Sequence, residues 1–129
     1  MYKLGDIVKI KPEWLNMPSE RNNRYIVTNV NEVTKRCHIQ CVTSDLALIP
    51  TELVGFDMIE KIVADRVIYA VIFFSVDGKT REEYEYTDIV AAKNHYNMFL
   101  NDDSGLYERI LLTETVIGLP EVILQYKDL

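Results

Sequence analysis

The chain has few of the residues that usually carry covalent or phosphate-binding chemistry. Its 129 residues include two cysteines, five glycines and one tryptophan. So few glycines argue against loops that cradle phosphate with backbone N–H groups, because such loops need glycine for close approach. The GxSxG, Walker A, GxGxxG, HExxH and paired CxxC motifs are missing as well. We therefore expect no catalytic residue, no cofactor and no enzymatic activity.

The two cysteines, Cys37 and Cys41, lie in a stretch that alternates like a strand. Four residues of extended chain span about 13 Å, whereas a disulfide needs Cα atoms within about 7 Å. A disulfide within this strand is therefore excluded, and two free thiols fit a reducing compartment. Alternation places His38 on the face opposite to both cysteines, so we expect no metal site there.

Long apolar runs are also missing. None approaches the roughly 20 residues that span a bilayer, and the opening MYKLGDIVKI lacks the apolar segment and cleavage site of a signal peptide. We expect a cytoplasmic location and no membrane partner. Residues 1–62 carry eight basic and eight acidic side chains, whereas residues 63–129 carry six and twelve. The acidic second half argues against nucleic-acid binding there, because it would repel phosphate.

The strongest structural signal is a β-hairpin within residues 66–87. Val67–Val76 is almost continuously apolar, which predicts a central strand covered on both faces. Asp77-Gly78 suits a tight turn, and Arg81–Tyr86 alternates tyrosine with charge, which predicts a strand with one solvated face.

The loop length decides which side chains share a face. A two- or four-residue loop places Val71 and Phe73 on the face of Tyr84 and Tyr86. A three-residue loop would place Tyr84 beside Ile72 instead. We favour the first register because it leaves the other face of the second strand uniformly charged.

A helix over residues 88–101 is predicted next, followed by strands over 106–115 and 122–126. Lys93 is expected to lie away from the apolar helix face, and Gly105 suits the left-handed position beyond the helix. The apolar face recurs at helical spacing and consists of Ile89, Ala92, Tyr96 and Phe99. The order is β-β-α-β-β, with the helix over one sheet face. The other face would be covered by the first half or by a second copy of the chain.

The first half reads as short strands separated by turn residues. Expected strands cover residues 7–11, 24–30, 36–43, 46–49 and 56–62. A long polar loop spans 12–23, and Pro50-Thr51 predicts a single helical turn over 51–54.

This order of elements, with the opening Gly-Asp-Ile-Val-Lys-Ile, resembles the SH3-like β-barrels over residues 1–62. The resemblance implies an N-terminal SH3-like five-stranded barrel, 1–62. We expect this barrel to pack against the C-terminal ββαββ antiparallel sheet with one helix, 66–129, that the pattern predicts, which together make an α+β fold. The linker 63–65 is too short for independent domain motion.

SH3-like modules often bind through aromatics beside their long first loop, so the resemblance implies a binding surface there. The matching residues are Trp14 and Tyr25, and Arg21, Arg24 and Lys11 lie nearby in the sequence. Aromatics interleaved with arginine suit docking of a peptide or stacking on bases. Trp14 can instead serve as a lid on the barrel core, and the sequence leaves both interpretations open.

We therefore expect a non-enzymatic protein–protein interaction module from a small cytoplasmic bacterial or mobile-element protein, with an unidentified protein partner. Eight tyrosines suit an interface, and a homodimer is one such assembly. The alternative is a nucleic-acid-binding module that acts through the SH3-like half. An enzyme, the least favoured hypothesis, would need acidic, histidine or cysteine side chains to converge from both halves.

Overall fold

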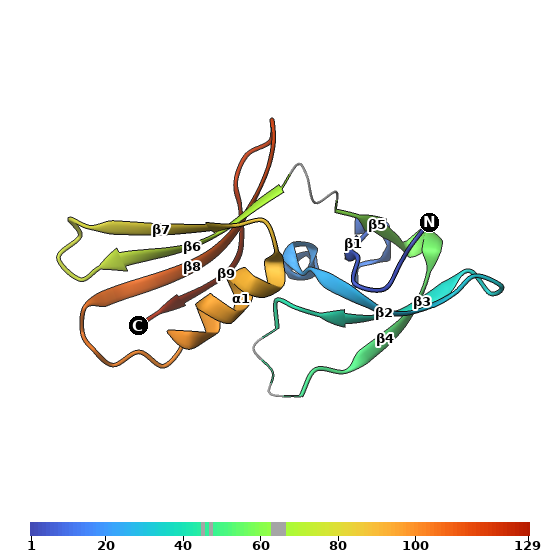
Figure 1. Cartoon of the computed structure of the whole chain (residues 1–129), viewed down its shortest axis with the longest axis horizontal. Coiled ribbons are helices and arrows are strands. Elements are labelled where there is room, and N and C mark those ends of the chain that lie inside the picture. The colour runs from blue at the N-terminus through green and yellow to red at the C-terminus, as the bar shows by residue number, and fades with distance from the viewer. Residues whose placement is uncertain (45, 47, 63–66) are drawn as a thin grey trace. The chain divides into compact units, whose positions relative to one another are not determined.

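The computed structural model describes residues 1–44, 46, 48–62 and 67–129. The chain divides into two compact units, Met1–Val63 and Ala64–Leu129. Each unit contains one antiparallel sheet, and the second also carries the α-helix (Figure 1). The architecture is mostly β-sheet with one helix and agrees broadly with an α+β class. The linker predicted at 63–65 lies outside the described residues.

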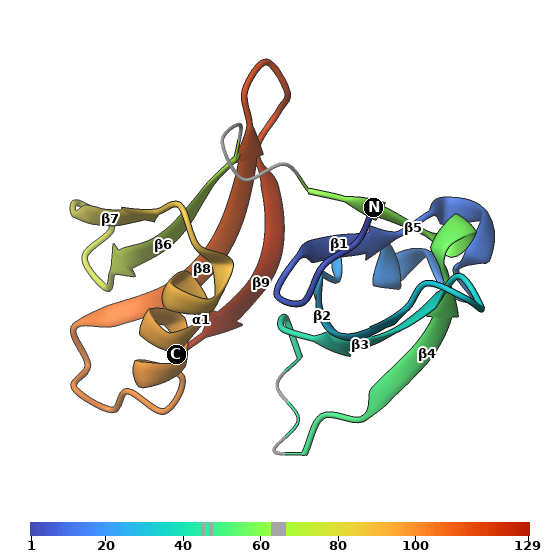
Figure 2. The same ribbon diagram turned by 45° about the vertical axis from the view of Figure 1, so that its right-hand side comes forward.

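The first unit is a five-stranded antiparallel sheet. Its strands are β1 (Ile7–Ile10), β2 (Tyr25–Asn31), β3 (Arg36–Cys41), β4 (Thr51–Gly55) and β5 (Ile59–Lys61). The strand order is β4-β3-β2-β1-β5, so β4 and β5 lie at opposite ends (Figure 2). No pairing between β4 and β5 closes the sheet among the described residues. The closed five-stranded barrel expected from the sequence is therefore not confirmed.

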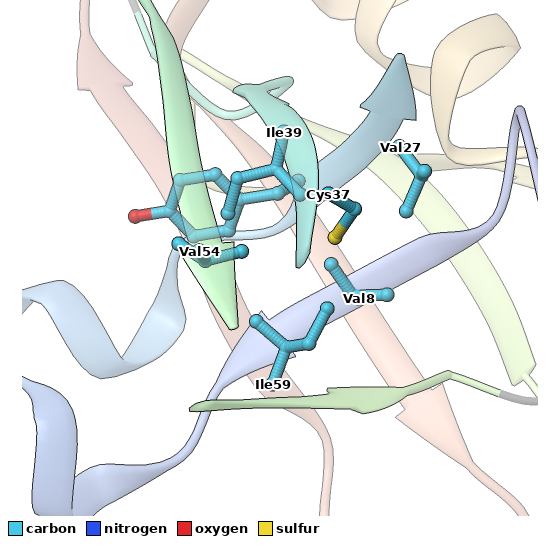
Figure 3. Packing of buried hydrophobic residues seen from close by; sticks show 7 residues of the cluster. Val8, Val27, Cys37, Ile39, Val54 and Ile59 are labelled. Atoms are coloured by element: carbon cyan, nitrogen blue, oxygen red, sulfur yellow. The ribbon is translucent and has the colours of Figure 1, made fainter. Parts of the chain in front are cut away.

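Alternating side chains from all five strands form the core of the first unit. Its buried members are Val8, Tyr25, Val27, Cys37, Ile39, Val54 and Ile59. Figure 3 shows the six of them that it labels gathered in one interior. Burying one such aliphatic side chain contributes roughly 1.5–3 kcal/mol. Both cysteines are free, and burial raises the pKa of the Cys37 thiol. The predicted alternation agrees with this core, because Cys37 belongs to it and His38 lies on the other face of β3.

The predictions of a strand over 46–49 and a helical turn over 51–54 are wrong. Thr51–Gly55 forms β4, which pairs with β3 through Cys37↔Val54 and His38↔Leu53. Among residues 46–49, the described ones, 46, 48 and 49, are not in a strand. Pro50-Thr51 resembles a helix start, but an isolated helical turn gains little, whereas pairing with β3 satisfies backbone groups and buries Val54. A 3₁₀ helix, η3 (Phe56–Met58), follows β4 directly before β5.

The second unit has the predicted ββαββ order. Its elements are β6 (Val67–Ser75), β7 (Arg81–Tyr86), α1 (Ile89–Met98), β8 (Tyr107–Val116) and β9 (Val122–Asp128). The strand order is β7-β6-β8-β9, so the apolar strand β6 is central, as predicted.

The hairpin register also follows the prediction. Val71 pairs with Tyr84, and Ile72 faces Glu83 rather than Tyr84. Gly78 adopts φ +69°, a conformation that side chains with a Cβ disfavour. The Asp77 carboxylate accepts hydrogen bonds from the Ser75 hydroxyl and from the Lys79 N–H, which lowers its pKa. The turn chemistry therefore supports the register that the pattern predicts.

The helix departs from the prediction at its end and at one side chain. Asp88 caps it by accepting a hydrogen bond from the Val90 N–H at 2.9 Å, but it ends at Met98, well before Gly105. Lys93 does not lie away from the buried face, because only 7% of it is exposed. Its ammonium lies 4.9 Å from the centre of the Tyr96 ring and donates to the Gln125 side chain. A long aliphatic stem allows lysine to pack while its head group reaches polar partners.

Candidate functional site

The loop between β1 and β2 folds into two short 3₁₀ helices, η1 (Pro12–Trp14) and η2 (Pro18–Asn22). Each begins with a proline, whose fixed φ suits the first helical position. The Trp14 N–H donates to the Lys11 carbonyl at 3.0 Å, and the Asn23 N–H donates to the Glu20 carbonyl at 2.9 Å. The loop thus has an internally bonded backbone that presents its side chains from defined positions.

Trp14 and Met17 are exposed apolar side chains, at 48% and 54%. Arg21, on η2, is exposed as well. Trp14 is not among the half-buried residues that pack on the first core, which are Tyr2, Ile10, Val30, Cys41, Phe56 and Met58. This placement favours the surface interpretation of Trp14 over the lid interpretation.

Arg24 and Tyr25, the other two residues of the predicted surface, are buried. The Arg24 guanidinium donates to the Arg21 and Asn23 carbonyls at 3.1 and 3.0 Å, and its backbone N–H donates to the Thr43 hydroxyl at 3.0 Å. Tyr25 belongs to the core of the first unit, and burial raises its pKa. Arg24 thus supports the loop from beneath, while Trp14 and Arg21 are available on its outside.

An aromatic cluster on the helix-covered face of the second sheet is a feature that the sequence analysis missed. The ring of Phe73 lies at its centre, 4.8 Å from Phe99 and 5.1 Å from Tyr107 between ring centroids. His95 lies 5.6 Å from Phe73, and its Nδ1 shares a 2.7 Å hydrogen bond with the Tyr86 hydroxyl. Two sequence patterns could have predicted this cluster. Tyrosine alternates along β7, and His95 and Phe99 are spaced four residues apart in the predicted helix.

Glu82 joins this cluster because alternation turns it toward the helix. Its Oε2 accepts hydrogen bonds from the hydroxyls of Tyr84 and Tyr107, at 3.2 and 3.1 Å. The negative charge and these hydrogen bonds raise the pKa of both tyrosines. A tyrosine that acts as a base near neutral pH needs a lowered pKa. Neither Tyr84 nor Tyr107 has the lowered pKa that such a base needs.

Two shallow hollows lie at the end of the first sheet where β2 turns into β3. One, of about 370 Å³, includes Lys35, Gly55 and Asp57 in its lining. The other, of about 330 Å³, includes Asn29, Asn31 and His38. Thr34, Arg36 and Leu53 line both, so the hollows are neighbours. The site could not be predicted from the sequence, because residues 51–54 were expected to form a helical turn rather than the strand β4.

The described part of the chain holds no group of three or more histidine, cysteine or acidic side chains placed to bind a metal. Nor does any helix in it have the length and apolar character needed to cross a bilayer. Searches found no protein-family model, no curated protein and no solved structure that matches this chain.

Proposed function

We propose that the chain is a non-enzymatic protein-binding module whose contact surface is the β1–β2 loop, with Trp14, Met17 and Arg21 as the main contacts. The observation that carries the proposal is the 48% exposure of Trp14 outside the packed core. Tryptophan and arginine are enriched among the residues that dominate binding energy at interfaces. A loop held by two proline-led turns also loses little conformational entropy on binding.

The architecture of the first unit supports this proposal. Its strand order, its long first loop and the 3₁₀ helix η3 directly before β5 suit an SH3-like module, although the sheet is open. Free thiols at Cys37 and Cys41 support a reducing, cytoplasmic location. A bacterial or mobile-element origin stays a prediction from the sequence.

A photo-crosslinking amino acid at position 17 tests the surface in the native cell. The matched control carries the same group at Leu4, a highly exposed apolar residue before β1. We expect a discrete adduct from position 17 that W14A and R21A abolish while the circular dichroism spectrum stays unchanged. An adduct that survives both substitutions, or that also forms from position 4, would refute the proposal.

A second copy of the chain is one partner that this surface allows. Light scattering separates this case from a foreign partner, because a dimer has twice the 15.0 kDa mass of the chain. W14A should return such a dimer to the monomer mass. A dimer unaffected by W14A would place the self-interface elsewhere.

Nucleic-acid binding is the alternative, and the exposure of Trp14 and Arg21 in one loop is the observation that favours it. Indole rings stack on unpaired bases, and such binding weakens steeply as salt rises. Anisotropy of a labelled single-stranded oligonucleotide, measured at low and high salt, tests it. Salt-sensitive binding that W14A abolishes would favour this alternative over protein binding.

A further inference from the structure

The outer edge of β4 offers backbone groups for pairing. β4 is the end strand of the first sheet (Figure 2). The Phe56 N–H donates to the Lys35 carbonyl at 2.9 Å, which makes Arg36↔Gly55 a pair without direct hydrogen bonds. Hydrogen-bonded and non-hydrogen-bonded pairs alternate along β3 and β4. Leu53 and Thr51 are therefore also in non-hydrogen-bonded pairs, and their N–H and C=O groups point away from β3. No described residue forms a backbone hydrogen bond to these outward groups.

The two hollows lie beside this edge, and more basic than acidic side chains line them. Arg36 and Leu53, which line both hollows, lie on the face of the sheet opposite to the core. Arg36 is exposed, and no described carboxylate lies within ion-pair distance of it. Lys35 adds a second cation and has only a 4.0 Å contact with Glu32. Asp57 is the single acidic side chain among the described lining residues.

The backbone of Lys35 adds a further observation. Its φ of +57° lies in the left-handed region, where a residue with a Cβ is strained and glycine is not. The Asn31 side chain holds the turn by accepting hydrogen bonds from the Val33 and Thr34 N–H groups, at 3.0 and 3.1 Å. A cation thus occupies the rim of the hollow at a position where backbone geometry favours glycine.

We propose that the β4 edge binds an extended acidic peptide segment of a partner protein as an added strand. The main chain of the segment pairs with the outward groups of Thr51 and Leu53, and a glutamate or aspartate side chain contacts Arg36 in the hollow. Backbone pairing supplies affinity and the side-chain pocket supplies specificity in this mode of recognition. The unpaired strand edge favours a peptide over another polyanion, because only a peptide main chain matches its alternating donors and acceptors.

This site is separate from the β1–β2 loop. The loop enters β2 at Tyr25 and the β2–β3 turn begins at Asn31, at the other end of the strand. The six steps from Tyr25 to Asn31 span about 20 Å, which separates the loop from the hollow beside Arg36. Thr51 lies level with Ile26 through Gln40, but it is two strands away from β2. One surface can therefore be altered without touching the other, and the two proposals can fail independently.

The test titrates the full chain with a blocked, labelled octapeptide of alternating valine and glutamate. We expect binding that slows hydrogen exchange at the Thr51 and Leu53 amides and leaves Trp14 fluorescence unchanged. A valine–lysine octapeptide should bind at least about tenfold more weakly. A valine–glutamate octapeptide with methylated backbone nitrogens keeps its charge but cannot donate, so it should lose binding.

Two substitutions separate this site from the loop. R36E should weaken binding of the valine–glutamate peptide about tenfold or more, since it reverses the charge in the hollow. The matched control R21E should leave peptide binding unchanged while it abolishes crosslinking from position 17.

Several results would overturn the proposal. They are no binding at about 1 mM peptide, equal binding by the methylated peptide, and an R36E variant that binds as well as the parent. Protection of the Thr51 and Leu53 amides in the peptide-free chain, together with a dimer mass, would show that a second copy occupies the edge instead.

Discussion

Replacing Phe73 with leucine gives a direct test of how the second unit is held together. Phe73 is only 2% exposed. Its ring centroid lies within 6 Å of four other rings, at 4.8 Å from Phe99, 5.1 Å from Tyr107, 5.6 Å from His95 and 5.9 Å from Tyr84. Leucine keeps much of the apolar volume but removes every ring pair. The substitution therefore isolates the aromatic contribution from simple burial.

The expected loss follows from these contacts. An aromatic pair contributes about 0.5–1.5 kcal/mol beyond area burial, so the four pairs at the lower end amount to about 2 kcal/mol. The change in side-chain shape adds about 1 kcal/mol. The total loss in the free energy of unfolding is about 3 kcal/mol. It lowers the urea midpoint of unfolding by about 3 M if that free energy falls by about 1 kcal/mol per M urea.

F56L is the matched control in the first unit. Phe56 is half-buried and has one ring partner, Tyr2, at 5.2 Å, so we expect a loss of about 1 kcal/mol. The chain carries suitable probes for both units. Trp14 fluorescence reports the first unit, and near-ultraviolet circular dichroism of tyrosine reports mainly the second, which holds six of the eight tyrosines. A shift for F73L no larger than that for F56L would refute the reasoning.

Three further predictions follow from single contacts. The pKa of Asp77 is lowered in the folded chain. Its carboxylate therefore stabilises the fold above the unfolded pKa of about 3.9, and this stabilisation is lost as pH falls through the folded pKa. D77N should make the acid unfolding curve flatter below about pH 4, and an acid unfolding curve identical to that of the parent would count against this prediction. K35G should raise the free energy of unfolding by about 0.5–1 kcal/mol in urea denaturation, because φ +57° suits glycine; a lower value would contradict this. E82Q should lower the pKa of Tyr84 and Tyr107 in an absorbance titration of tyrosinate, and an identical titration would show that Glu82 does not raise them.

The proposed binding surface could be predicted only in part from the residues. A tryptophan and an arginine in a polar loop indicate a candidate surface, and the structure leaves both Trp14 and Arg21 exposed. The neighbouring Arg24 and Tyr25 are chemically just as suitable but are buried. Residue type does not distinguish these cases, because burial depends on which strand face points toward the core. The β4 edge was out of reach, since its strand was predicted as a helical turn.

The sequence by itself determined the features that depend on neighbours along the chain. They include the Val67–Tyr86 hairpin and its register, the alternation that separates Cys37 from His38, and the ββαββ order. Period-two alternation and turn residues act locally, so they can be read directly. Only the tertiary structure decided that Thr51–Gly55 is an edge strand and that Lys93 is buried. It also decided that Glu82 and His95 meet tyrosines from other elements. These outcomes depend on partners distant in sequence, whose pairing and packing energies outweigh local propensity.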